Sequence, residues 1–100
     1  MKKLPIYVRS RSFGGAEIDD LWILARLQLG DVTTLDLLNS FECYKGVTLT
    51  PMGVTNFKRF CNARLNCMAE YGLVEKTGKV FQHGSNYMSW IYTGPKEGEE

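Results

Sequence analysis

The change of sequence period at Gly72 most constrains what this chain can fold into. From Thr50 to Tyr71 the apolar residues recur every three or four positions, which is the period of an amphipathic helix. After Gly72 the segments LVEKTGKVFQ and YMSWIYT are rich in residues that favour strands, and HGSN between them is typical of a turn. The second half of the chain therefore predicts one long helix followed by a β-hairpin, with Thr77-Gly78 as a candidate bulge or a competing earlier turn.

The long helix combines an apolar side with an unusual polar side. Thr50 is a candidate N-cap and Pro51 suits the first helical position. Arg64 is the exception on the apolar side, where we expect it either to extend its charged end to solvent or to meet an acidic residue from earlier in the chain. The opposite side carries Thr55, Lys58, Arg59, Asn62, Ala63, Asn66 and Glu70, with Asn56 near its start. Asparagine is a poor helix former, so this face indicates binding, although Lys58 and Arg59 have the simpler alternative of solvating the surface.

Two shorter helices are expected before the long one. The first spans roughly residues 16–29, with an apolar stripe facing the core at Ile18, Leu21, Trp22, Ala25 and Leu29. Its other side, which carries Ile23, Leu24 and Leu27, needs a second partner: either the N-terminal residues Leu4, Ile6 and Val8, or another copy of the protein. The second helix spans residues 34–41, because Thr33 and Asp36 form the pattern of a capping box.

Charge is distributed unevenly along the 100 residues, which suffice for one domain. Residues 1–15 carry four basic residues and no acidic one, and residues 16–49 carry six acidic residues against two basic ones. Residues 50–93 again favour basic residues, by five to two. We therefore divide the chain into a basic arm (1–15), a domain (16–94) and an acidic tail (95–100), and expect a polyanion to contact the two basic segments.

Several classes of function are not indicated by the sequence. The three cysteines and one histidine lack the spacing of a zinc site, so no metal or cofactor is expected. Enzyme activity is not expected either, because the chain has no phosphate-binding glycine loop and no nucleophile elbow. No apolar run is long enough to span a bilayer, and no signal-peptide core is recognisable, so a cytoplasmic location is expected.

The order of these elements resembles the winged helix-turn-helix superfamily. Leu65, Met68, Gly72, Leu73 and Val74 are similar to its pattern L-x-x-L-x-x-x-G-L-V, and WIYT at residues 90–93 looks like the return strand of the wing. The resemblance covers about residues 16–94. It implies an α+β winged-helix fold, in which three helices are followed by a C-terminal β-hairpin wing, and it implies that the third helix enters the major groove of DNA.

We therefore expect sequence-specific binding of double-stranded DNA by a small transcriptional regulator, of the kind a phage or mobile element encodes. Asparagine can pair with adenine, while arginine and lysine can reach guanine or phosphate. The expected DNA-binding residues are Thr55, Asn56, Lys58, Arg59, Asn62, Ala63 and Asn66 on the helix, Lys76, Lys79, Ser85 and Asn86 on the hairpin, and Arg9 and Arg11 in the arm. The alternative is a protein-binding adaptor that does not bind DNA, since the same fold serves both uses. A homodimer or protein partner would then contact the first helix.

Overall fold

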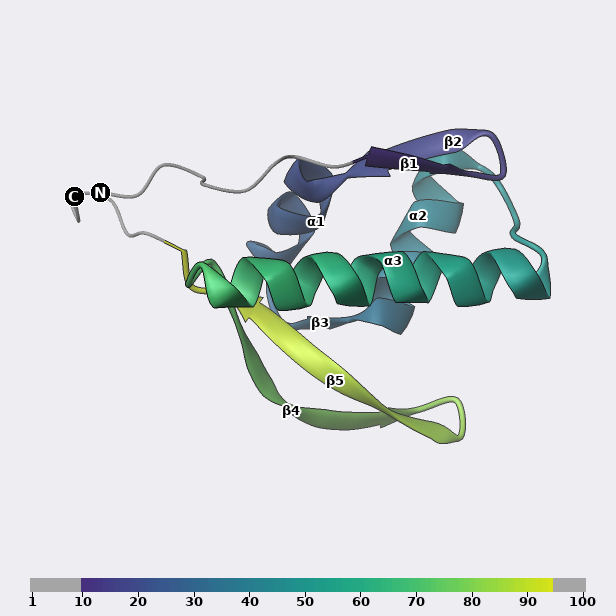
Figure 1. Cartoon of the computed structure of the whole chain (residues 1–100). Coiled ribbons are helices and arrows are strands. Elements are labelled where there is room, and N and C mark those ends of the chain that lie inside the picture. The colour runs from purple at the N-terminus through teal and green to yellow at the C-terminus, as the bar shows by residue number, and fades with distance from the viewer. Residues whose placement is uncertain (1–9, 95–100) are drawn as a thin grey trace.

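A computed structural model describes residues 10–94 as a mixed α+β fold with three helices and two small sheets. The element order is β1 (Ser10–Phe13), β2 (Ala16–Asp19), α1 (Asp20–Leu27), β3 (Val32–Thr33), α2 (Thr34–Lys45), α3 (Pro51–Glu70), β4 (Val74–Gln82) and β5 (Ser85–Tyr92). Figure 1 shows α3 running along one side of the molecule, with α1 and α2 behind it and a hairpin on either side of it.

The winged-helix prediction, with three helices followed by a C-terminal β-hairpin, is wrong. An antiparallel hairpin, β1–β2, comes before the helices, and β3 joins the second sheet in the order β3-β5-β4. The physical reason lies at Gly14 and Gly15, whose φ angles of 59° and 85° suit a two-residue turn with positive φ at both positions. A side chain at Gly14 would also approach Leu49 to 2.9 Å.

The first helix is shorter than predicted and faces the other way. Residues 16–19 form β2, and α1 begins only after Asp19, whose side chain accepts a hydrogen bond from the backbone N–H of Trp22. The side predicted to need a second partner is the buried side, at Ile23, Leu24 and Leu27. Leu21 and Leu29, which were predicted to face the core, are exposed.

The other local predictions are largely confirmed. Thr33 and Asp36 form a capping box at the start of α2, which extends four residues beyond the predicted end at Phe41 and stops at Lys45. Thr50 caps α3 by accepting a hydrogen bond from the backbone N–H of Gly53 at 3.1 Å. The hairpin β4–β5 turns at residues 83–84, so Ser85 and Asn86 already belong to β5.

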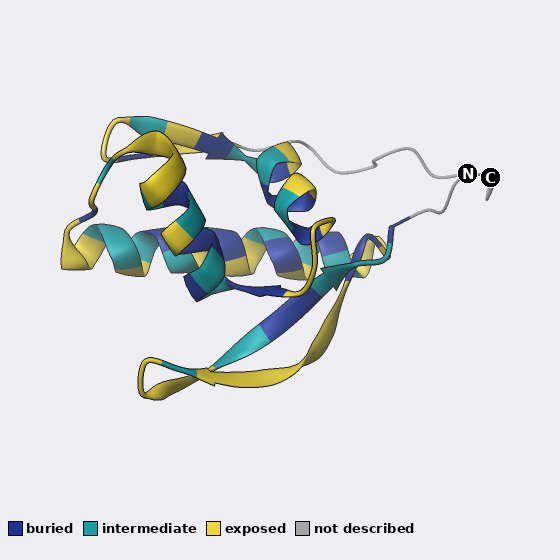
Figure 2. Ribbon diagram, turned by 180° about the vertical axis from the view of Figure 1, so that it is seen from behind, coloured by how far each residue is buried: buried dark blue, intermediate teal, exposed yellow. Residues whose placement is uncertain are grey.

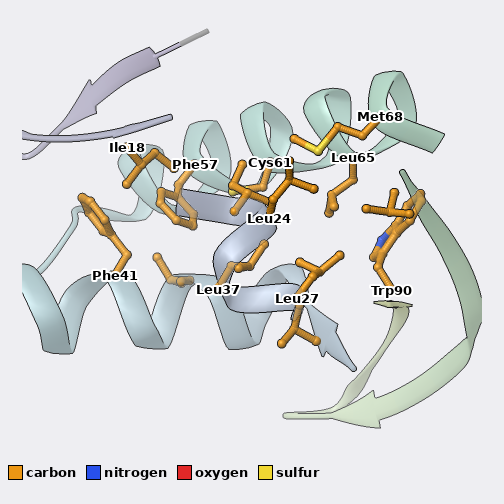
Figure 3. Close-up of a cluster of buried hydrophobic side chains, with 14 of the residues drawn as sticks. Ile18, Leu24, Leu27, Leu37, Phe41, Phe57, Cys61, Leu65, Met68 and Trp90 are labelled. Carbon is orange, nitrogen blue, oxygen red and sulfur yellow. The ribbon is translucent and has the colours of Figure 1, made fainter. Parts of the chain in front are cut away.

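The core lies between α3 and the two helices behind it. Phe41, Phe57 and Phe13 stack edge to face or tilted around the β1–β2 end, with ring centroids 4.9–6.3 Å apart. Figure 3 shows Cys61, Leu65 and Met68 of α3 continuing this core towards Trp90 of β5. Because α3 contributes a buried residue at almost every turn, its opposite side is fixed as an outer surface.

Candidate nucleic-acid interface

A polar stripe runs along the outer side of α3. Its members are exposed and recur at helical spacing: Pro51, Met52, Thr55, Arg59, Asn62, Ala63, Asn66 and Glu70. Five of the seven predicted DNA-binding residues of this helix therefore lie side by side on one face. Asn56 is partly buried at the edge of the stripe, where it lines a shallow hollow with Thr55, Arg59 and the first residues of the helix.

Two side chains of the stripe are held by local hydrogen bonds. The Asn66 amide donates to the backbone carbonyl of Asn62 at 2.9 Å, and the Thr55 hydroxyl donates to the carbonyl of Pro51 at 3.2 Å. The bond at Asn66 uses one amide hydrogen, so its second hydrogen and its oxygen can still form the bidentate pair that adenine accepts. Arg59 and Asn62 occupy the middle of the stripe between these two residues.

Lys58 has a different position from its neighbour Arg59. It is partly buried, and its Nζ donates a hydrogen bond to the Tyr87 hydroxyl at 2.9 Å while lying 4.8 Å from the centre of the Tyr87 ring. Tyr87 belongs to β5, so this contact joins α3 to the hairpin. In this arrangement Lys58 positions the hairpin beside the stripe rather than extending from the stripe itself.

The hairpin β4–β5 presents the remaining predicted residues. Lys76, Lys79, Ser85 and Asn86 are all exposed, and Figure 2 shows exposed residues along most of β4. The hairpin turn has positive φ at both His83 and Gly84, at 46° and 81°, which matches a tight two-residue hairpin turn. The predicted bulge is confirmed, because the register shifts between Lys76 and Gly78.

Gln82 is a positioning residue of the hairpin that the sequence analysis missed. Its Oε1 accepts a hydrogen bond from the Thr33 hydroxyl at 2.8 Å, and its Nε2 donates to Oδ1 of Asp36 at 3.1 Å. The two partners are the residues of the capping box of α2, 49 and 46 positions away in the chain. Local sequence gives no signal for such a contact, since it depends on the path of the whole hairpin.

Gln82→Ala is expected to lower the free energy of unfolding by about 1–2 kcal/mol, because it removes two hydrogen bonds and leaves the Thr33–Asp36 capping box in place. Urea unfolding followed by tryptophan fluorescence measures the change. Gln28→Ala is the matched control, since Gln28 is exposed at the end of α1 and should change stability by less than about 0.5 kcal/mol. Equal effects of the two substitutions would show that Gln82 does not hold the hairpin.

Arg11 lies on the other hairpin, at the opposite side of α3. It is exposed on β1, and its guanidinium is 5.3 Å from the centre of the Phe13 ring, which packs against Phe57 and Phe60 of α3. This places a cation near the N-terminal half of α3, on the side of the β1–β2 hairpin. Arg9, the other predicted arm residue, lies outside the described residues.

Electrostatics distinguish the stripe and the hairpin β4–β5 from the rest of the fold. Residues 51–69 and 76–93 contain no aspartate or glutamate. The acidic residues before α3 belong to β2, α1, α2 and the turn before β3, namely Glu17, Asp19, Asp20, Asp31, Asp36 and Glu42. Because α1 and α2 lie behind α3 (Figure 1), negative potential is favoured there, while residues 51–93 carry five basic residues against Glu70 and Glu75.

A buried ion pair fixes α3 against α1 beneath this surface. Both carboxylate oxygens of Asp20 accept hydrogen bonds from Arg64, at 2.8–3.2 Å, and Asp20 is completely buried. The bond to Asp20 raises the pKa of the Arg64 guanidinium. Of the two alternatives expected for Arg64, the structure shows the acidic partner, although the sequence did not indicate which of the acidic residues it would be.

The three cysteines have very different surroundings. Cys43 is exposed on α2, Cys67 is partly buried on α3, and Cys61 is buried in the core. Burial and, to a smaller extent, the charge of Asp20 raise the pKa of the Cys61 thiol. The neutral thiol therefore predominates at Cys61. Among the described residues, no group of three or more cysteine, histidine, aspartate or glutamate residues could hold a metal ion.

Brief labelling of the folded protein with iodoacetamide is expected to modify Cys43 and to leave Cys61 unmodified. The alkylating agent reacts with accessible thiolate, which the burial and the raised pKa of Cys61 both disfavour. Peptide mass spectrometry reads out each site. Labelling in urea is the control, because there Cys61 should react as readily as Cys43. Rapid modification of Cys61 in the folded protein would contradict its position in the core.

Comparison of the chain with protein-family models, with curated proteins and with solved structures gives no match. None of the helices within residues 10–94 is long and apolar enough to cross a membrane. The candidate site therefore rests on its geometry and charge alone.

Proposed function

We propose that this protein binds duplex DNA, with the polar stripe of α3 in the major groove and the hairpin β4–β5 beside it on the backbone, and that it serves as a small site-specific transcriptional regulator. The observation that carries the proposal is the outer face of α3, on which Arg59, Asn62 and Asn66 lie together and Glu70, at the C-terminal end, is the acidic member. An α-helix fits the major groove, and these side-chain types form hydrogen bonds with guanine and adenine edges there.

The division of roles follows from the position of each residue. Arg59, Asn62 and Asn66 are exposed in the middle of the stripe and would read bases. Lys76 and Lys79 would supply attraction to phosphates that is independent of sequence, as would Arg11 on the opposite hairpin. Lys58 would act through Tyr87 by holding the hairpin next to the helix.

The test is binding to random-sequence duplex DNA across a salt titration. We expect a dissociation constant on the order of 1–100 μM that rises steeply with salt, because counterions are released from the DNA. Lys76→Ala with Lys79→Ala should reduce the slope of log K against log salt by about 1–2. Lys45→Ala is the control on α2, behind α3, and should leave the slope unchanged. Absence of binding at about 50 mM salt would reject the proposal.

A protein-binding adaptor is the second candidate function, favoured by the surface of α1 and α2. A pocket of about 470 Å³ lies there, lined by Trp22, Arg26, Asn39, Ser40, Cys43 and Tyr44. Leu21 in α1 and Leu29 just after it are also exposed, and the homodimer or protein partner expected at the first helix would contact them rather than the buried Ile23, Leu24 and Leu27. Sedimentation of the purified protein over a range of concentrations distinguishes a second copy of the chain from a different protein as the partner. A homodimer gives a sedimentation coefficient that falls on dilution, whereas a monomer gives a constant one.

A further inference from the structure

Phe81 at the end of the hairpin β4–β5 has no role in the fold. Its side chain is 70% exposed, although it is one of the larger apolar residues of the chain, and it stands two positions before the turn at His83. Its neighbour in the opposite strand is Asn86, which is also exposed. An aromatic ring in this place contributes little to the core and is available to a ligand.

The bulge in β4 brings positive charge to the same face of the hairpin as Phe81. Lys76 pairs with Trp90, Lys79 with Met88 and Phe81 with Asn86. Residues 86, 88 and 90 of β5 share one face because side chains alternate along a strand, so their three partners share that face as well. Without the extra residue at Thr77, Lys76 and Lys79 would point to opposite faces.

The hairpin is held at two points close to its tip. Tyr87 receives the hydrogen bond from Lys58 of α3, and Gln82 bonds to Thr33 and Asp36 at the start of α2. These contacts flank Phe81 in the chain on one side and across the hairpin on the other. The ring therefore belongs to a hairpin whose position is already fixed before a ligand binds. Less conformational entropy is then lost on binding.

We infer that Phe81 inserts between two base pairs of duplex DNA from the minor groove and kinks the duplex. This inference rests on the proposed function. Apolar side chains inserted from the minor groove partly unstack a base step and bend DNA, while neighbouring lysines and asparagines contact phosphates and base edges. The face that carries Lys76, Lys79, Phe81 and Asn86 supplies this combination within one hairpin.

Duplex DNA suits this face better than a protein partner does. Residues 76–93 contain no acidic residue, and the face of the ring also carries Lys76, Lys79 and Asn86. A polyanion is attracted to such a surface, whereas an apolar protein surface would have to desolvate both lysines. Pyrimidine–purine steps such as TA are the most easily unstacked, and they are the expected sites of insertion.

The experiment uses the full chain and a 30-base-pair duplex with one central TA step in G·C-rich flanks. Dyes at the two ends report bending by energy transfer, and 2-aminopurine in place of the adenine of the TA step reports unstacking. We expect the wild-type protein to increase both signals, with a bend of roughly 20–90°. Phe81→Ala should bind within about threefold of the wild type at low salt and lose both signals, because phosphate attraction remains. Phe81→Leu should keep both signals, since leucine also acts as a wedge.

Val80→Ala is the matched control, because Val80 is exposed beside Phe81 but pairs with Tyr87 and so points to the other face. It should behave as the wild type. Wild-type binding without bending or unstacking would overturn the insertion and leave the proposed function standing, as would full signals from Phe81→Ala. Failure of the wild-type protein to bind any duplex would overturn both. If Phe81→Ala does not bind at all, the test is the 2-aminopurine signal of the wild-type complex. An increase supports unstacking of the TA step, and no increase overturns the insertion.

Discussion

Replacing Arg59 and Asn62 together with alanine is expected to weaken binding to a selected duplex site by about 100-fold or more while leaving the protein folded. Each side chain that pairs with a base edge contributes about 1–3 kcal/mol of discrimination, and both residues are exposed in the middle of the stripe. Selection of a binding site from a random library provides the duplex, and fluorescence anisotropy at constant salt measures the loss.

The control for this double variant is Arg26→Ala with Asn39→Ala. It makes the same chemical changes on α1 and α2, behind α3, where Arg26 bonds to Ser40 and Asn39 is exposed. We expect it to bind DNA as the wild type does. If the two double variants lose affinity equally, binding depends on net charge and the stripe does not read bases. If the Arg59 and Asn62 variant unfolds, these residues are not at the surface.

Asp20→Ala is expected to lower the free energy of unfolding by about 3 kcal/mol, because it removes the carboxylate that pairs with the partly buried Arg64 guanidinium. Both oxygens of Asp20 accept hydrogen bonds from Arg64, and Asp20 is completely buried. A loss of this size is a large fraction of the stability of a small domain. Urea unfolding and circular dichroism at 10–25 °C measure it.

Removing both charges distinguishes the contribution of the ion pair to stability from that of the packing around it. Asp20→Leu with Arg64→Met should recover most of the lost stability, since apolar residues of similar size often replace a buried pair at little cost. Glu17→Ala is the matched control for loss of one carboxylate, because Glu17 is exposed on β2 and should change stability by less than about 0.5 kcal/mol. If Asp20→Ala costs no more than Glu17→Ala, the pair does not hold α1 on α3.

The parts of the fold that could be predicted are those whose signal is local. The Thr33–Asp36 capping box, the Thr50 cap and the hairpin after Gly72 each depend on a few consecutive residues, and all three are present. The β1–β2 hairpin also had a local signal in Gly14-Gly15, but the apolar residues that follow it were assigned to a helix. That error moved the start of the first helix and thereby reversed which of its sides faces the core.

The candidate site could be predicted only as a set of exposed residues. The helical spacing of the sequence placed Arg59, Asn62 and Asn66 on the outer side of α3. The other side is defined by the buried residues Phe57, Cys61 and Leu65. The contacts of Lys58 with Tyr87 and of Gln82 with α2 join residues 29 to 49 positions apart, so no local pattern reveals them. These contacts nevertheless decide where the hairpin lies relative to the stripe.

The measurement that tests DNA binding by this face most directly is a titration of the ¹⁵N-labelled protein with duplex DNA, followed by amide NMR spectra. At 11.4 kDa every amide can be followed. We expect the shifted amides to lie on the outer side of α3 around Arg59 and Asn62 and on the hairpin β4–β5, with little change on α1 and α2. Shifts centred on α1 and α2, or none at a DNA concentration of about 1 mM, would contradict the proposal.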